Sequence, residues 1–218
     1  MDLLTRIVKF ISDGGIWMWP IMTAGAVGIA IFFERYWLLS SITRLNKKAW
    51  DELHPVLVAG DFDKARQIAE GDKSTISKLL SLGLAVQGAA RRRDDIEIGM
   101  EEGMMEIIPQ LEMRTQYISL LANISTLLGL LGTVMGLIAA FTAVAHAAPA
   151  EKADLLAAAI SVGMNCTAFG LIFGIPLMIL HSYILSMTAR VVTSLEMASV
   201  KTINIIIAAS KRVSKAAA

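Results

Sequence analysis

Two threonines lie within long stretches of the sequence that carry no charged side chain. Thr133 lies in residues 117–150 and Thr167 in residues 155–189, and neither stretch contains Asp, Glu, Lys or Arg. An ionisable group inside a membrane is the usual mark of a proton or ion relay. A threonine hydroxyl can orient water or a protonated carboxyl group, but it does not exchange protons near neutral pH. If protons pass these threonines, another chain must supply the carboxylate.

Small residues accompany both threonines at helical spacing. Ser125, Gly129, Thr133 and Gly136 form one stripe, and Gly163, Thr167, Gly170 and Gly174 form another. Such stripes let helix backbones approach closely, and hydroxyl groups can form hydrogen bonds across the gap. Two interpretations remain open: the stripes pack the helices, or they also line an ion pathway. The helix-packing candidates are Gly129, Gly132, Gly136, Gly163, Gly170 and Gly174.

The two stretches are expected to form an antiparallel hairpin with its turn near Pro149 and Ala150. Thr133 and Thr167 are each 17 residues from Ala150. In an antiparallel pair, residues equally far from the turn lie at similar depth, so the hydroxyl groups should face the same level. The secondary polar candidates are Ser161, Asn165 and Ser125. They rank below the threonines because such groups more often pack helices than bind ligands.

The composition indicates an all-α integral membrane protein. The 218 residues are 55% hydrophobic with a mean hydropathy of +0.60, and three segments reach the roughly 20 apolar residues that a membrane helix needs. We predict a first span at 16–39, preceded by an interfacial helix at 1–15. A cleaved signal peptide is the competing interpretation of this span, but its apolar run is long and leads into residues 33–37 without a clear cleavage site.

The remaining segments are predicted to be helical as well. Residues 40–116 form a cytoplasmic helical region, residues 117–189 contain spans two and three with an outward turn near 145–154, and residues 190–218 form a C-terminal helix and tail. Helix starts are expected at Asp61 and at Ser74 or Thr75, and Pro109 should kink or restart a helix. Because 34 uncharged residues reach about 51 Å as helix, spans two and three should extend into a cytoplasmic helical stalk.

The distribution of Lys and Arg predicts the orientation. Residues 34–116 contain twelve and residues 190–218 contain five, whereas residues 1–15 contain two and the turn at 151–154 contains one. Cytoplasmic loops retain such residues, so the N-terminus should face outward and the C-terminus should lie in the cytoplasm. The net charge of +1 gives no indication of nucleic-acid binding.

The sequence also lacks the motifs of common enzymes. It has no GxSxG, HExxH or phosphate-binding Gly-rich motif, and no Cys/His cluster for a metal. We therefore expect no enzyme activity, cofactor or metal. Cys166 is the only cysteine, which rules out an intramolecular disulfide, and it should pack inside span three.

Several sequence blocks resemble the MotA/TolQ/ExbB proton-channel family. They are LLGLLGTVMGLIAAF in span two, TAFGLIFGIP in span three and ERYWLL at the end of span one. Three spans with a large cytoplasmic region are most similar to the ExbB and TolQ subunits. One position departs from the family, because Val162 stands where many relatives have a glutamate.

The resemblance implies a pentamer in the bacterial inner membrane. It would surround the single membrane helices of ExbD- or TolR-like subunits. These subunits carry a membrane aspartate, which would supply the missing carboxylate. A TonB- or TolA-like protein would be a further partner. Thr133 and Thr167 match the family's pore threonines. The implied function couples proton-motive force to mechanical work on periplasmic or outer-membrane partners, and the alternative is a membrane scaffold without proton conduction.

Overall fold

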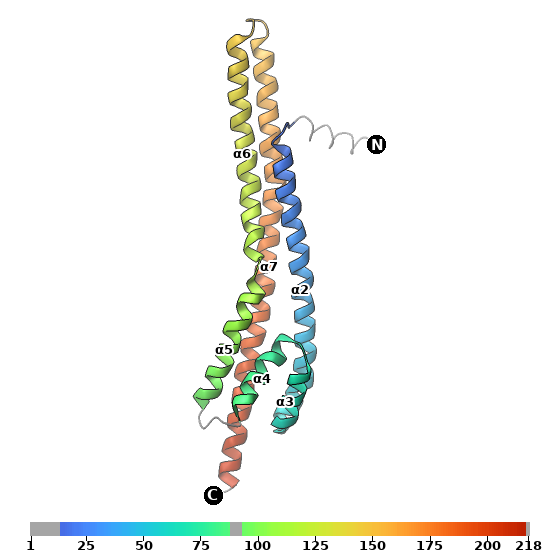
Figure 1. Ribbon diagram of the computed structural model, residues 1–218, viewed down its shortest axis with the longest axis vertical. Helices are drawn as coiled ribbons and strands as arrows, with labels where there is room; N and C mark the ends of the chain where they lie inside the picture. Colours follow the sequence, from blue (N-terminus) through green and yellow to red (C-terminus); the bar gives the residue numbers. More distant parts are fainter. Residues whose placement is uncertain (1–13, 88–92, 217–218) are drawn as a thin grey trace, which may run out of the picture. The chain divides into compact units, whose positions relative to one another are not determined.

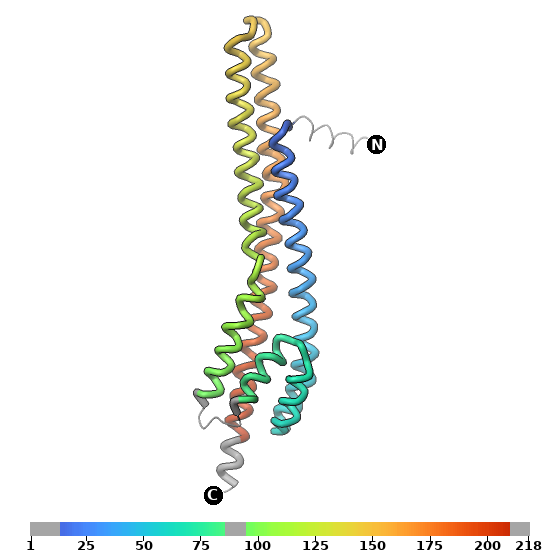
Figure 2. The backbone as a smooth tube through the Cα atoms, in the orientation of Figure 1, coloured from blue at the N-terminus to red at the C-terminus, as the bar shows by residue number. Residues whose placement is uncertain are grey.

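The computed structural model describes residues 14–87 and 93–216, and it contains six helices in this part of the chain. Figure 1 labels the helices and Figure 2 traces the backbone through them. Their bounds are α2 (Met18–Ala59), α3 (Phe62–Gly71), α4 (Thr75–Gln87), α5 (Arg93–Glu112), α6 (Thr115–His146) and α7 (Lys152–Ala216). The predicted interfacial helix at 1–15 falls almost wholly outside the described residues.

Three helical segments of the described chain are long and apolar enough to cross a membrane. They are Met18–Ala59, Asp95–His146 and Lys152–Ala209. The prediction of an all-α membrane protein with three membrane helices is confirmed.

The short helices α3 and α4 begin at the predicted polar residues. Asp61 accepts a hydrogen bond from the backbone N–H of Lys64, 3.2 Å away, and so caps α3. Ser74 Oγ accepts a hydrogen bond from the backbone N–H of Ser77 at 3.1 Å, at the start of α4. Each side chain satisfies a backbone donor that the first helical turn leaves without a partner.

The helix break expected at Pro109 lies a few residues later. Pro109 lies inside α5, which continues to Glu112, and its carbonyl still accepts a hydrogen bond from Met113 N at 3.0 Å. Arg114 instead has a left-handed backbone with φ of 67° and precedes α6. The reason is that a proline removes only one donor, whereas a residue with a positive φ cannot continue a right-handed helix.

The described chain divides into two compact units. The first comprises the residues up to Glu34 together with Arg114–Ile184. Its apolar core contains Met18, Ile21 and Phe169, and the ring of Phe169 meets that of Phe173 edge to face at 5.1 Å. Aromatic pairs favour this geometry because the ring edge is positive and the face negative.

The second unit comprises Arg35–Met113 and Leu185–Ala218. Arg35, only 1% exposed, donates hydrogen bonds from Nη2 to the carbonyl oxygens of Leu111 at 2.6 Å and Gln110 at 3.4 Å. These carbonyls belong to the last turn of α5, where backbone acceptors lack helical partners and the helix dipole favours a cation. Arg35 therefore fixes the end of α5 against α2.

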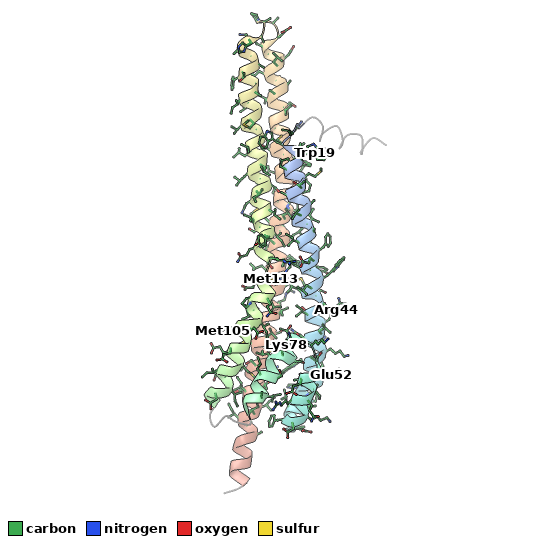
Figure 3. All side chains as sticks on the ribbon, in the orientation of Figure 1. Trp19, Arg44, Glu52, Lys78, Met105 and Met113 are labelled. Atoms are coloured by element: carbon green, nitrogen blue, oxygen red, sulfur yellow. The ribbon has the colours of Figure 1, made fainter. Side chains whose placement is uncertain are left out.

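Replacing Arg35 should destabilise the protein. Arg35→Met keeps an unbranched apolar stem but removes the charged donor, and a hydrogen bond to a charged group contributes about 1.5–3 kcal/mol. We expect a lower thermal melting temperature in detergent. Arg44→Met is the matched control, since Arg44 is exposed and bonds only its own helix at Ser40 (Figure 3). Equal melting temperatures for both variants would contradict the proposed capping by Arg35.

Asp72 should make the stability of the second unit depend on pH. Partial burial raises the pKa of Asp72, but hydrogen bonds from Ser74 and Ser77 lower it by a larger amount. The pKa of Asp72 is therefore below its ordinary value. A lowered pKa in the folded state stabilises the protein above the pKa of the unfolded state, and this stabilisation is lost as the pH falls through the folded pKa. Asp72→Asn should lower stability at neutral pH and reduce its decline in acid. Melting curves from neutral to acidic pH test this, and an unchanged slope would contradict it.

Candidate functional site

The candidate site lies between α6 and α7 in the first unit, where the two helix backbones approach closely. A Cβ atom placed on Gly170 would lie 2.6 Å from the carbonyl oxygen of Ser125 and 3.0 Å from Cα of Gly129. A Cβ atom on Gly129 would lie 2.9 Å from the carbonyl oxygen of Cys166. Only glycine fits at these positions without a shift of the backbone. This close approach brings the polar groups of the two helices within reach.

The other glycines of the two stripes also face a neighbouring segment. Gly163 lies against Thr133, whose Cα would be 3.1 Å from an added Cβ. Gly132 faces the side chain of Cys166, and Gly174 faces Thr126. Gly136 is less crowded, because the nearest atoms would be 3.5 Å from its Cβ.

Thr133 and Thr167 meet at the centre of this interface, and their hydroxyl groups are in hydrogen-bond contact. The prediction that they share one level is confirmed. Thr133 Oγ1 lies 2.8 Å from the carbonyl oxygen of Gly163 on α7. Thr167 Oγ1 lies 3.2 Å from the carbonyl oxygen of Gly129 on α6.

The contacts of the two threonines are reciprocal. Each hydroxyl reaches the carbonyl oxygen four residues before the other threonine, on the opposite helix. Thr133 Oγ1 is also 3.3 Å from the carbonyl oxygen of Gly129 on its own helix. Both side chains are half-buried, so the pair combines fixed backbone acceptors with access from outside. Each hydroxyl carries one proton and two lone pairs, so the pair can present a donor or an acceptor.

The secondary polar candidates do not join the threonine pair. Ser125 is fully buried and donates to the carbonyl oxygen of Leu121 at 2.8 Å, within its own helix. Asn165 is half-buried and Ser161 exposed, and neither makes a hydrogen bond to another residue of the described chain. These positions suit packing or a surface contact rather than the site itself.

Two polar contacts of the first unit went unpredicted. Arg114 Nη1 lies 2.9 Å from Glu34 Oε1 in an exposed ion pair, and Cys166 Sγ lies 2.9 Å from the carbonyl oxygen of Gly14. Each joins residues far apart in sequence, so no local pattern identifies it. Within the described residues, no cluster of His, Cys, Asp or Glu could hold a metal ion.

Adding one methyl group at Gly170 should disturb the interface. Gly170→Ala places Cβ against two backbone groups, and overpacking of this kind costs about 1–3 kcal/mol. We expect a lower melting temperature of the purified protein in detergent. Gly136→Ala is the control with ordinary contact distances and should change the melting temperature little. A larger loss for Gly136→Ala than for Gly170→Ala would contradict the geometry.

These features define a class of protein: an integral membrane protein whose apolar helices pair through glycine and threonine. Residues 71–197 match the MotA/TolQ/ExbB proton channel family. This match covers more than half of the chain, so the protein belongs to the MotA/TolQ/ExbB proton channel family. The family places it among channel subunits rather than enzymes.

Three curated relatives have similar sequences. The biopolymer transport protein exbB1 of Vibrio cholerae is 32% identical over 171 residues, which cover 74% of this chain and 72% of the relative. A putative ExbB homologue of Methanothermobacter thermautotrophicus is 25% identical, covering 84% of this chain and 64% of the relative. A putative ExbB-like protein of Synechocystis is 23% identical, covering 85% and 73%.

Proposed function

We propose that this protein is a proton-channel and motor subunit that couples proton-motive force to mechanical work on periplasmic or outer-membrane partners. The observation that carries the proposal is the Thr133–Thr167 pair, held at one level between two uncharged stretches of α6 and α7. Half-buried hydroxyl groups in such a position can orient a protonated carboxyl group or a water molecule. The similarity to proteins named for biopolymer transport supports the same function.

The partner must bring the group that carries the proton. Because spans two and three contain no carboxylate, we infer a single-span ExbD- or TolR-like subunit with a membrane aspartate facing the threonines. Several copies of this chain, five by resemblance to the family, would form a wall around the partner helices. A TonB- or TolA-like protein would receive the force.

The proposed orientation places the protein in a bacterial inner membrane, with the N-terminus periplasmic and the C-terminus cytoplasmic. The excess of Lys and Arg in residues 34–116 and 190–218 supports this orientation. One charge moving through 100 mV releases about 2.3 kcal/mol, so each proton can drive only a modest step. Larger work therefore requires several protons in succession.

Removing the two hydroxyl groups should reduce proton flux. Thr133→Val and Thr167→Val keep the shape of the side chain but remove the donor and acceptor. Loss of one hydrogen bond worth about 1.4 kcal/mol corresponds to about a tenfold slower flux. The measurement is proton uptake into liposomes containing the complex, purified from its host membrane through an affinity tag on this chain.

Thr142→Val is the matched control, because Thr142 also lies on α6 but bonds only the carbonyl oxygen of Ile138. It should leave the flux unchanged. If both site variants assemble and conduct like the unmodified complex, the role of the threonine pair is wrong. If dissipating the proton gradient changes no activity of the complex, the scaffold interpretation holds instead.

A further inference from the structure

A second candidate site is a cavity of about 200 Å³ in the second unit, between α2, α7 and the start of α4. Its walls are apolar and two cations line it. The residues that matter are Asn46, Lys47, Trp50, Ile76, Arg190 and Met197. Met197 is 49% exposed, so a large apolar side chain stands open to its surroundings here. No part of the threonine site uses this cavity.

Asn46 joins the wall of the cavity to the start of α4. The residue is 3% exposed, and its Oδ1 accepts a hydrogen bond from the backbone N–H of Ile76 at 3.2 Å. This contact orients the amide group, because only the oxygen can accept. Nδ2 is buried and has no hydrogen-bond partner. The amide group is therefore withdrawn from the cavity, whose wall here is apolar.

The charged residues that line the cavity favour an anionic occupant. Lys47 and Arg190 line it, no acidic residue does, and neither cation forms an ion pair within the described chain. The occupant should therefore combine carboxylate groups with apolar side chains. A lipid is a poor match, because the cavity lies several helical turns beyond the apolar end of the first span.

The outer face of α5 has this chemistry. Ile98, Glu101, Glu102 and Met105 follow one helical stripe at steps of three, one and three, and all four are exposed. Ile98 is 55% and Met105 66% exposed, although α5 already buries its opposite face through Met100. Figure 3 labels Met105 on α5. Residues 94–113 contain seven acidic side chains and no Lys or Arg. The stripe is thus apolar, acidic and uncovered.

The stripe and the cavity also lie at the same depth. Counting about 1.5 Å per residue from the contact between Arg35 and Leu111, Asn46 lies about 16 Å along α2 and Glu102 about 14 Å along α5. Copies inserted in one membrane share one orientation, so surfaces that meet between copies must match in depth.

Two further contacts also place the cavity and the α5 stripe at the same depth. Ser199 Oγ lies 3.0 Å from Met100 Sδ, and Lys201 Nζ lies 5.9 Å from the centre of the Trp50 ring. Met100 on α5 and Trp50 on α2 therefore meet α7 within two residues of each other. All of the residues compared here belong to the second unit.

We propose that the cavity receives the α5 stripe of a second copy of this chain, with a carboxylate of Glu101 or Glu102 pairing with Lys47 or Arg190. Ile98 and Met105 then cover the apolar wall. The contact joins two different surfaces, so repetition produces a ring rather than a closed dimer. The proposal rests on the proposed function, because it names the contact through which the copies of the channel assemble.

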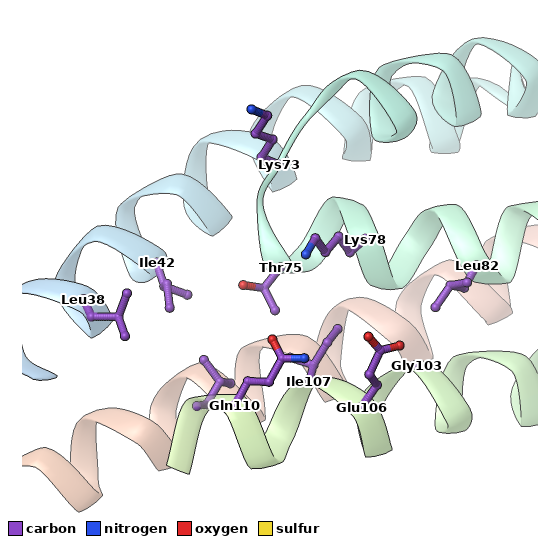
Figure 4. Close-up of a pocket in the computed structure, with 11 residues that line it drawn as sticks. Leu38, Ile42, Lys73, Thr75, Lys78, Leu82, Gly103, Glu106, Ile107 and Gln110 are labelled. Atoms are coloured by element: carbon purple, nitrogen blue, oxygen red, sulfur yellow. The ribbon is translucent and has the colours of Figure 1, made fainter. Parts of the chain in front are cut away.

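A neighbouring cavity of about 210 Å³, between α2, α4 and α5, does not have this chemistry. Lys73 and Lys78 line it together with Glu106, which lies on the facing helix α5 (Figure 4). Its charges are of both signs. It therefore selects no particular occupant.

Cysteine cross-linking tests the contact in native membranes. In a Cys166→Ala background, the pair Lys47→Cys with Glu102→Cys should give a ladder of dimers, trimers and larger species on mild oxidation. The control pair is Lys48→Cys with Glu102→Cys. Lys48 has the same depth and exposure but does not line the cavity and pairs with Glu52. The control pair should give much less of the cross-linked dimers, trimers and larger species.

The outcomes distinguish this contact from the proposed function. Bands that stop at the dimer, equal ladders from both pairs, or cross-links only to a different protein overturn the contact. Absence of cross-links in a complex that native mass spectrometry shows to contain several copies, and that conducts protons, also overturns the contact but leaves the proposed function. Absence of both oligomer and proton flux overturns the proposed function itself.

Discussion

The close backbone contact between α6 and α7 is the constraint on which the site depends. Gly129 and Gly170 leave no room for a Cβ atom, so the two helices meet through backbone atoms. Within a membrane, apolar side chains gain little by meeting each other rather than lipid, and close packing with hydrogen bonds decides which helices pair. Glycine therefore determines which helices pair here, as apolar side chains such as leucine do in the core of a soluble protein. The threonines can reach across the interface only because the glycines bring the helices together.

The sequence predicted this part of the structure well because the signals are strong and local. Long uncharged stretches identified the membrane helices, and simple counting from Ala150 placed Thr133 and Thr167 at one depth. Capping residues likewise located the starts of α3 and α4. In each case a single element, or two elements joined by a short turn, contains all the information.

Other features could not be predicted because they depend on distant contacts. Arg35 at the end of a membrane span usually reaches towards water, yet here it is buried against carbonyl groups 75 and 76 residues away. The position of the helix break was misjudged because Pro109 is the more obvious signal, whereas the left-handed backbone of Arg114 has no sequence marker. The exposed stripe of α5 also went unpredicted, because the burial of a helix face, shown here by Met100, depends on packing against other elements.

The reciprocal hydrogen bonds of Thr133 and Thr167 also give the hairpin an adjustable polarity. Each hydroxyl proton can turn about its C–O bond within picoseconds to nanoseconds, while the carbonyl oxygens of Gly129 and Gly163 stay fixed in their helices. The direction of the local dipole can therefore reverse without movement of the backbone. In the proposed function, a neutral acid and its anion would meet the same atoms with opposite hydrogen-bond orientation, so one fixed arrangement of helices would accommodate a carrier in both of its protonation states.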